Sequence, residues 1–75
     1  MVEMTNRPFD VLNNAIGKEV LILLKGDISV RGTLKAFDVH MNILLENAEQ
    51  LANGELKTKF GKLMIRGDNI LFISP

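Results

Sequence analysis

The stretch ISVRGTLKAFDVHMNILL, residues 28–45, decides the fold because its alternation of apolar and polar residues changes phase near the middle. Within 28–36 the apolar side chains fall on even positions, and from 39 to 45 the odd positions become apolar, at Val39, Met41, Ile43 and Leu45. Since a slip of one residue reverses the two faces of a strand, the chain must turn or bulge at 38–41. The residues expected to face the core from the first strand are Ile28, Val30, Leu34 and Ala36.

Gly32 lies on the core-facing side of that first strand. A glycine inside a strand often marks a sharp bend or a close approach of another backbone. Strong curvature at Gly32 would let a small sheet curl toward a barrel. The second strand is expected to run over 42–48 and to continue the same curved sheet.

Three further strands are predicted around this pair. The segment EVLILLKGD at 19–27 is an apolar run that ends in a turn signal, which indicates a strand buried on both faces. The dipeptide Asn-Gly at 53–54 is a strong hairpin signal. It is followed by apolar and alternating segments that predict strands at 55–66 and 69–74.

The segment TNRPFDVLNNAIG at 5–17 predicts a short amphipathic helix. Thr5 or Asn6 could cap it and Pro8 suits its first turn, while Phe9, Leu12 and Ile16 are expected to share its apolar face. The predicted fold class is therefore mainly β. A short N-terminal α-helix is followed by a five-stranded, strongly bent antiparallel sheet that forms a small open barrel, and residues 1–75 form a single domain.

The composition limits how such a domain can be stabilised. The chain has 75 residues, no cysteine and one histidine, so neither disulfides nor a metal can support its small core. Self-association is the remaining route, and the apolar last strand at 70–73 presents an edge that a neighbouring subunit could pair with.

The charge and hydropathy pattern indicates where such a protein would act. Nine basic and nine acidic residues give a formal charge of zero, so any nucleic-acid site must be local. No apolar run approaches the roughly 20 residues that span a bilayer, and no signal peptide is evident. The simplest expectation is a soluble, cytoplasmic protein without a membrane partner.

Two polar clusters, DVHMN at 38–42 and IRGDN at 65–69, interrupt the apolar pattern. Taken alone they have structural explanations: Arg66 could pair with Asp68 across a turn, and Asn42 could cap a turn. A hydrolytic site is disfavoured because the chain has no cysteine and its serines lack an evident shared site with His40. No catalytic residue, metal or cofactor is therefore expected.

The chain resembles the Sm and Sm-like (LSm) family, particularly its archaeal members. VLILLKGDISVRGTLKAFDVHMNILLENAEQ matches the first family motif and KLMIRGDNILFISP matches the second, so the resemblance covers nearly the whole chain. It implies subunits joined by pairing the fourth strand of one to the fifth strand of the next. The resulting ring is usually a heptamer. The resemblance further implies a homo-oligomer that binds U-rich single-stranded RNA at its central pore, with roles in RNA processing or ribonucleoprotein assembly.

The resemblance also implies how a base would be held. His40 and Arg66 would stack on its opposite faces, as planar side chains do with unstacked RNA bases. Asn42 would read the uracil edge, because an amide both donates and accepts hydrogen bonds. Asp38 is expected to orient Asn42 or to contact a ribose.

Three further RNA-binding candidates flank these positions. Asp68 is expected to hold its turn or to supplement base contacts, and Gly67 to permit close backbone approach beside the base. Met41 lies in the apolar phase and is expected to pack rather than to recognise.

Two alternatives remain open. The chain could be an oligomeric protein-interaction scaffold with no specific RNA ligand. Lys57, Lys59 and Lys62 could form a second basic surface, but strand alternation places only Lys57 and Lys59 on one face. A solvated strand face is the simpler interpretation of these lysines.

Overall fold

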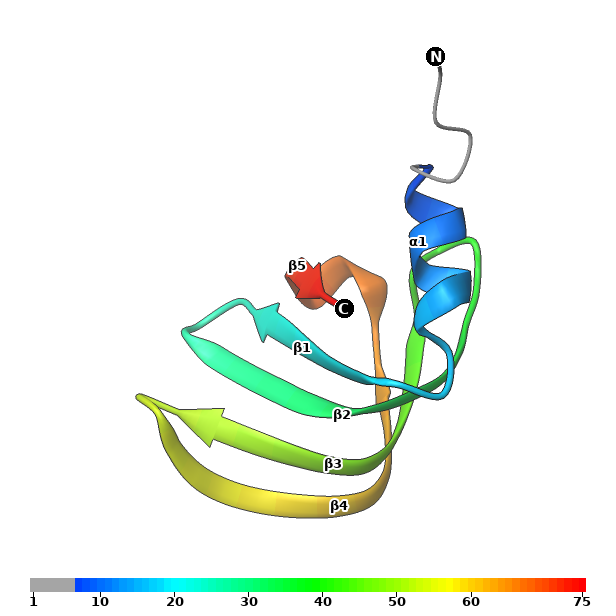
Figure 1. The fold of residues 1–75 in the computed structure, drawn as a ribbon. Helices are drawn as coiled ribbons and strands as arrows, with labels where there is room; N and C mark the ends of the chain where they lie inside the picture. Colours follow the sequence, from blue (N-terminus) through cyan, green and yellow to red (C-terminus); the bar gives the residue numbers. More distant parts are fainter. Residues whose placement is uncertain (1–6) are drawn as a thin grey trace.

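The computed structural model describes residues 7–75 and shows one helix followed by a bent five-stranded antiparallel sheet (Figure 1). The strand order is β4-β3-β2-β1-β5, so β4 and β5 form the two edges and the sheet stays open. The predicted fold class is confirmed. The elements are α1 (Pro8–Ala15), β1 (Glu19–Leu24), β2 (Ile28–Phe37), β3 (Ile43–Ala52), β4 (Glu55–Ile65), the 3-10 turn η2 (Gly67–Asn69) and β5 (Ile70–Ser74).

Helix α1 lies over one open end of the curved sheet (Figure 1). Its buried residues are Leu12 and Ala15, so the predicted apolar face of Phe9, Leu12 and Ile16 is wrong at Ile16. Ile16 lies outside the helix with extended backbone, and the Phe9 ring packs edge-on against Phe37 with ring centroids 5.3 Å apart. Both side chains remain 44% exposed. The predicted caps Thr5 and Asn6 lie outside the described residues.

The sheet bends sharply where Gly32 of β2 passes over β3. A Cβ atom at Gly32 would lie 3.0 Å from the Cα atom of Ala48 and 3.1 Å from the Glu46 carbonyl oxygen, so the predicted close backbone approach is confirmed. Beside it, β3 carries a bulge at Asn47, whose φ is 51°. The β3–β4 pairing passes from Glu46↔Lys62 to Ala48↔Phe60 around this point. The bulge bends both strands at one place.

The core lies inside the curved sheet, and its fully buried side chains include Ile22, Leu34, Ile43 and Leu45. β1 was expected to be buried on both faces, but its burial alternates and Leu21 is 40% exposed. No element of the described chain covers the outer face of the sheet at β1. The prediction treated an apolar sequence as evidence of two-sided burial, which the open sheet does not provide.

Two further details of the strand prediction are wrong. Ala36 is exposed because the β2–β3 register shifts between Leu34 and Ala36, which turns Ala36 outward. β3 extends over Ile43–Ala52 rather than 42–48, because the bulge at Asn47 hides the continuing alternation. The predicted turn at 38–41 and the Asn-Gly hairpin are confirmed; Asn53 and Gly54 both have positive φ.

Candidate nucleic-acid interface

The fold brings together the two polar loops that follow β2 and β4. The backbone N–H of Gly67 donates a 3.0 Å hydrogen bond to Oδ1 of Asn42, a contact between residues 25 positions apart. A Cβ atom at Gly67 would collide with the carbonyl oxygen of His40 and would lie 2.9 Å from that of Met41. Glycine is therefore needed at position 67 because the two loops lie too close together for a side chain, and not because the backbone has a positive φ.

Asp38 organises the first loop as an acceptor of several hydrogen bonds. Its Oδ1 accepts from the backbone N–H groups of His40 at 2.9 Å and Asn42 at 3.0 Å. Its Oδ2 accepts from Nδ2 of Asn42 at 3.1 Å. The side-chain bond from Asn42, followed by the backbone bonds, lowers the pKa of Asp38 below its ordinary value.

The amide of Asn42 is oriented from both ends. Its oxygen accepts from Gly67 and its nitrogen donates to Asp38, so the orientation of the amide follows from the network. One N–H of Nδ2 and one lone pair of Oδ1 remain for a ligand. A donor and an acceptor side by side match a base edge that carries both a carbonyl oxygen and an imide N–H.

His40 and Arg66 are exposed on the adjoining loops. Nη2 of Arg66 lies 3.2 Å from Oδ2 of Asp68, and the two side chains are 80% and 63% exposed. An ion pair this exposed adds little stability. The guanidinium can therefore exchange Asp68 for a ligand at small cost.

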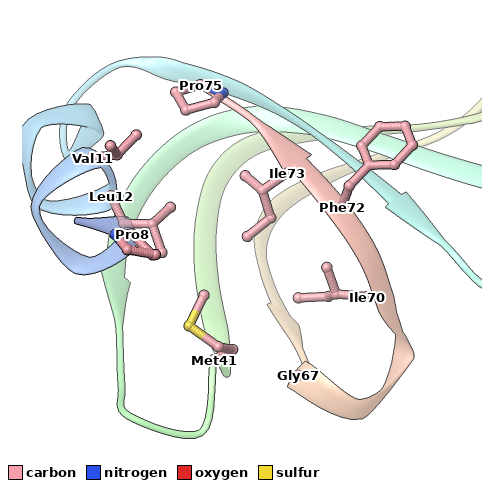
Figure 2. Close-up of a pocket in the computed structure, with 9 residues that line it drawn as sticks. All are labelled: Pro8, Val11, Leu12, Met41, Gly67, Ile70, Phe72, Ile73 and Pro75. Atoms are coloured by element: carbon pink, nitrogen blue, oxygen red, sulfur yellow. The ribbon is translucent and has the colours of Figure 1, made fainter. Parts of the chain in front are cut away.

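Met41 is the predicted site residue that the structure separates from the polar cluster. It has a φ of 63°, and its side chain packs against the core. Figure 2 shows it pointing into an apolar groove of about 500 Å³ between α1 and β5. The groove is lined by Pro8, Val11, Leu12, Met41, Gly67, Ile70, Phe72, Ile73 and Pro75.

Sequence reasoning had not identified the hydrogen bond from Gly67 to Asn42 or the position of Lys62. The first is a backbone contact between distant loops, and no local pattern encodes it. The outward position of Lys62 follows from the irregularity at Asn47 and Gly61. The sequence signal for that irregularity was an asparagine in β3 opposite a glycine in β4. Both residue types are unusual inside strands.

Within residues 7–75, no three His, Asp or Glu side chains gather where they could hold a metal ion. In the same part of the chain, no helix has the length and apolar character needed to cross a membrane.

The protein is a small β-protein in which the loops that follow β2 and β4 are hydrogen-bonded to each other at one side of a bent, open sheet. Comparisons with known proteins identify its family. The family model described as LSM domain matches residues 10–75. An Sm-like protein of Methanosarcina barkeri is 53% identical over 72 residues, which cover 96% of this chain and 100% of that protein. The chain therefore belongs to the LSM family.

Solved structures agree with this assignment. A Pyrococcus abyssi Sm protein in complex with a uridine heptamer has a TM-score of 0.91 and 44% identity, covering 93% of this chain and 99% of that one. The Sm protein heptamer of Pyrobaculum aerophilum has a TM-score of 0.86 and 42% identity, covering 99% of this chain and 96% of that one. The predicted family is thereby confirmed.

A pH dependence follows from the hydrogen bonds to Asp38. Because the pKa of Asp38 is lowered in the folded protein, its carboxylate stabilises the fold fully above about pH 4, the ordinary aspartate value. That stabilisation is lost as the pH falls through the lowered pKa. We expect the thermal midpoint of the native protein to exceed that of Asp38→Asn by a constant margin from neutral pH to about pH 5.

The margin should shrink in more acidic buffer, as the native aspartic acid becomes protonated. The measurement is thermal unfolding of both proteins at one protein concentration across a pH series, since association makes the midpoint depend on concentration. A margin that stayed constant down to the most acidic buffer would show that the Asp38 carboxylate adds no stability.

Proposed function

We propose that this protein is a noncatalytic RNA-binding protein that forms a homo-oligomeric ring and binds U-rich single-stranded RNA at its central pore. The observation that carries the proposal is the network that joins Asp38, Asn42 and Gly67 and leaves the Asn42 amide one free donor and one free acceptor. The uridine heptamer held by the similar P. abyssi protein supports the same ligand. Roles in RNA processing or ribonucleoprotein assembly would follow.

The ring is supported by the two edges of the sheet. β4 and β5 each pair with one neighbour in the described chain, and β5 exposes Leu71 and Phe72 by 57% and 54%. An apolar edge of this kind is normally covered or paired. Pairing β4 of one subunit with β5 of the next removes both edges and enlarges the core, and the similar P. aerophilum heptamer supports seven subunits.

Each subunit then contributes one base site. His40 and Arg66 stack on the two faces of a base, while the amide of Asn42 bonds its edge; Asp38 fixes that amide. Asp68 holds Arg66 until RNA arrives. Met41 supports the loop from behind, through its contact with the core.

Ring closure explains how modest contacts give tight binding. Stacking on one side chain contributes on the order of 1–3 kcal/mol per base, which is weak at a single site. Identical sites hold successive nucleotides of one strand, so each later contact is effectively intramolecular and avidity accumulates.

The proposal is tested by native mass spectrometry of the purified protein with a short oligo(U) and with oligo(A). Selective retention of oligo(U) by a closed ring is expected. Equal and negligible retention of both would overturn RNA recognition and favour a protein-interaction scaffold. A stable monomer would overturn the ring.

Arg66→Ala should weaken oligo(U) binding by at least about fivefold while the ring stays assembled, because stacking of this kind is worth about 1–3 kcal/mol per base. Arg66 is exposed, and within residues 7–75 its one ion pair is with exposed Asp68, so its loss should not disturb the fold. Fluorescence anisotropy measures the affinity, and gel filtration measures assembly. Loss of the ring would reassign Arg66 to a structural role.

A further inference from the structure

Six charged residues share the outer face of the sheet across three strands. They are Arg31 and Lys35 on β2, Glu46 and Glu49 on β3, and Lys59 and Lys62 on β4, and together they define the β2–β4 face. The expectation that Lys62 would point away from Lys59 is wrong. The reason is that inward-facing residues of β4 lie three positions apart here, at Phe60 and Leu63, so Gly61 is an extra residue and the two lysines point to the same side.

The pairing registers establish the outward direction. Leu45 and Ala48 of β3 are buried, and their partners Leu63 and Phe60 of β4 pack against the core. The neighbouring pairs therefore point outward: Lys62 lies opposite Glu46, and Lys59 lies opposite Glu49.

The charges on this face do not cancel. Nε of Arg31 lies 2.8 Å from Oε1 of Glu49, and Nζ of Lys35 lies 3.7 Å from Oε1 of Glu46, so β2 already supplies a cation to each carboxylate. Within the described part of the chain, neither Lys59 nor Lys62 forms an ion pair. On β2–β4 four cations face two carboxylates, and Glu19 of the neighbouring β1 adds a third carboxylate beside Arg31. The β4 lysines remain the surplus cations in a chain whose formal charge is zero.

A hollow of about 350 Å³ opens at the bulge, beside Lys59. It is lined by Asn47, Ala48, Glu49, Lys59, Phe60 and Gly61. A Cβ atom at Gly61 would meet no heavy atom within 4 Å, so this part of the β4 backbone is open to approach. The hollow gives a bound chain space beside the cation, and Asn47 adds hydrogen-bonding capacity.

The β2–β4 face also leads to the candidate base site. β4 runs from Glu55 to Ile65, and Arg66 follows directly. At roughly 3.3 Å per residue, Lys62 lies about 13 Å and Lys59 about 23 Å along the strand from Arg66. RNA that leaves the base site can therefore pass over both lysines.

We propose that the β2–β4 face binds the phosphate backbone of RNA that extends beyond the base site. The inference rests on the proposed function and adds a second contact surface to it. Exposed lysines suit this ligand because phosphate contacts need charge at regular spacing and no apolar anchor. A phosphate backbone is favoured over an acidic protein because the two unpaired lysines lie along one strand that leads directly to the candidate base site.

The test compares the native ring with the double variant Lys59→Gln/Lys62→Gln. Two ligands are used: a uridine heptamer, and a longer RNA that carries the same heptamer followed by a tail without uridine. Heptamer affinity should be unchanged. For the longer RNA, the slope of log affinity against log salt should fall in magnitude by about 1.4 for each contacted subunit, since a single-stranded contact contributes about 0.7. That change corresponds to roughly 25-fold in affinity per tenfold change in salt.

The matched control is Lys18→Gln/Lys25→Gln, which removes the same charge from two exposed positions outside the β2–β4 face. It should leave the affinity for both RNAs and the salt dependence of binding unchanged. Glu46→Gln should have the opposite effect to the β4 double variant and strengthen binding of the longer RNA, because it removes the ion-pair partner of Lys35. Native mass spectrometry checks that every variant remains a ring.

The outcomes separate the inference from the function beneath it. If the native ring fails to bind the heptamer, the proposed function fails. If the heptamer binds and Lys59→Gln/Lys62→Gln leaves the affinity and salt slope of the longer RNA unchanged, the β2–β4 face does not bind phosphate and the inference is overturned. An equal loss from the control variant would also overturn it, because the effect would then reflect overall charge.

Discussion

Gly67→Ala is expected to weaken oligo(U) binding by more than about a hundredfold. The added Cβ atom would collide with the His40 carbonyl oxygen, so the loop carrying His40 must move away from Gly67. Movement breaks the hydrogen bond from the Gly67 N–H to Asn42, and the amide loses its fixed orientation. Because every subunit carries the change, the loss multiplies through avidity, which can contribute 10² or more.

Gly61→Ala provides the matched control. It makes the same chemical change in β4, where a Cβ atom meets nothing within 4 Å. Stability and the binding of a uridine heptamer, which does not extend beyond the base site, should therefore be nearly unchanged. Overpacking at Gly67 should cost about 1–3 kcal/mol of stability, which thermal unfolding can measure. Tight oligo(U) binding by Gly67→Ala would show that contact between the two loops is not needed for recognition.

The strands could be predicted because local periodicity encodes them. The phase change between Phe37 and Ile43 located the turn, and the Asn-Gly dipeptide located the hairpin. The bulges could not be located from the same pattern. Asn47 of β3 and Gly61 of β4 are each an extra residue that turns the following side chains over, so alternation assigned Lys62 to the wrong face.

The candidate site was predicted only in part, for a related reason. The resemblance identified both polar loops, and the geometry brings Asn42 and Gly67 into contact. Whether a side chain stacks or reads a base depends on the ligand. The roles of His40, Arg66 and Asp68 therefore remain proposals. Local sequence also could not show that the Asn42 amide is held from both sides, because one of its partners comes from a distant loop.

Leu71→Glu is the second change expected to have a large effect, and it acts on the proposed ring. Leu71 is 57% exposed on the edge strand β5, so the substitution should leave the fold of one subunit intact. In the ring the same position would lie at the junction with β4 of the next subunit. A charge placed there without a partner costs several kcal/mol at every junction. We expect native mass spectrometry to show mainly monomers.

Dispersal should also remove most of the RNA affinity, even though no residue of the base site has changed. Each isolated subunit would keep one base site, and the affinity gained from avidity, on the order of 10² or more, would be lost. Lys25→Glu is the control, since it adds the same residue in the exposed turn between β1 and β2. An intact ring formed by Leu71→Glu would contradict assembly through β5, whereas monomers that bind oligo(U) as tightly as the native protein would contradict the avidity argument. The two readings together separate how the subunits assemble from how each one holds a base.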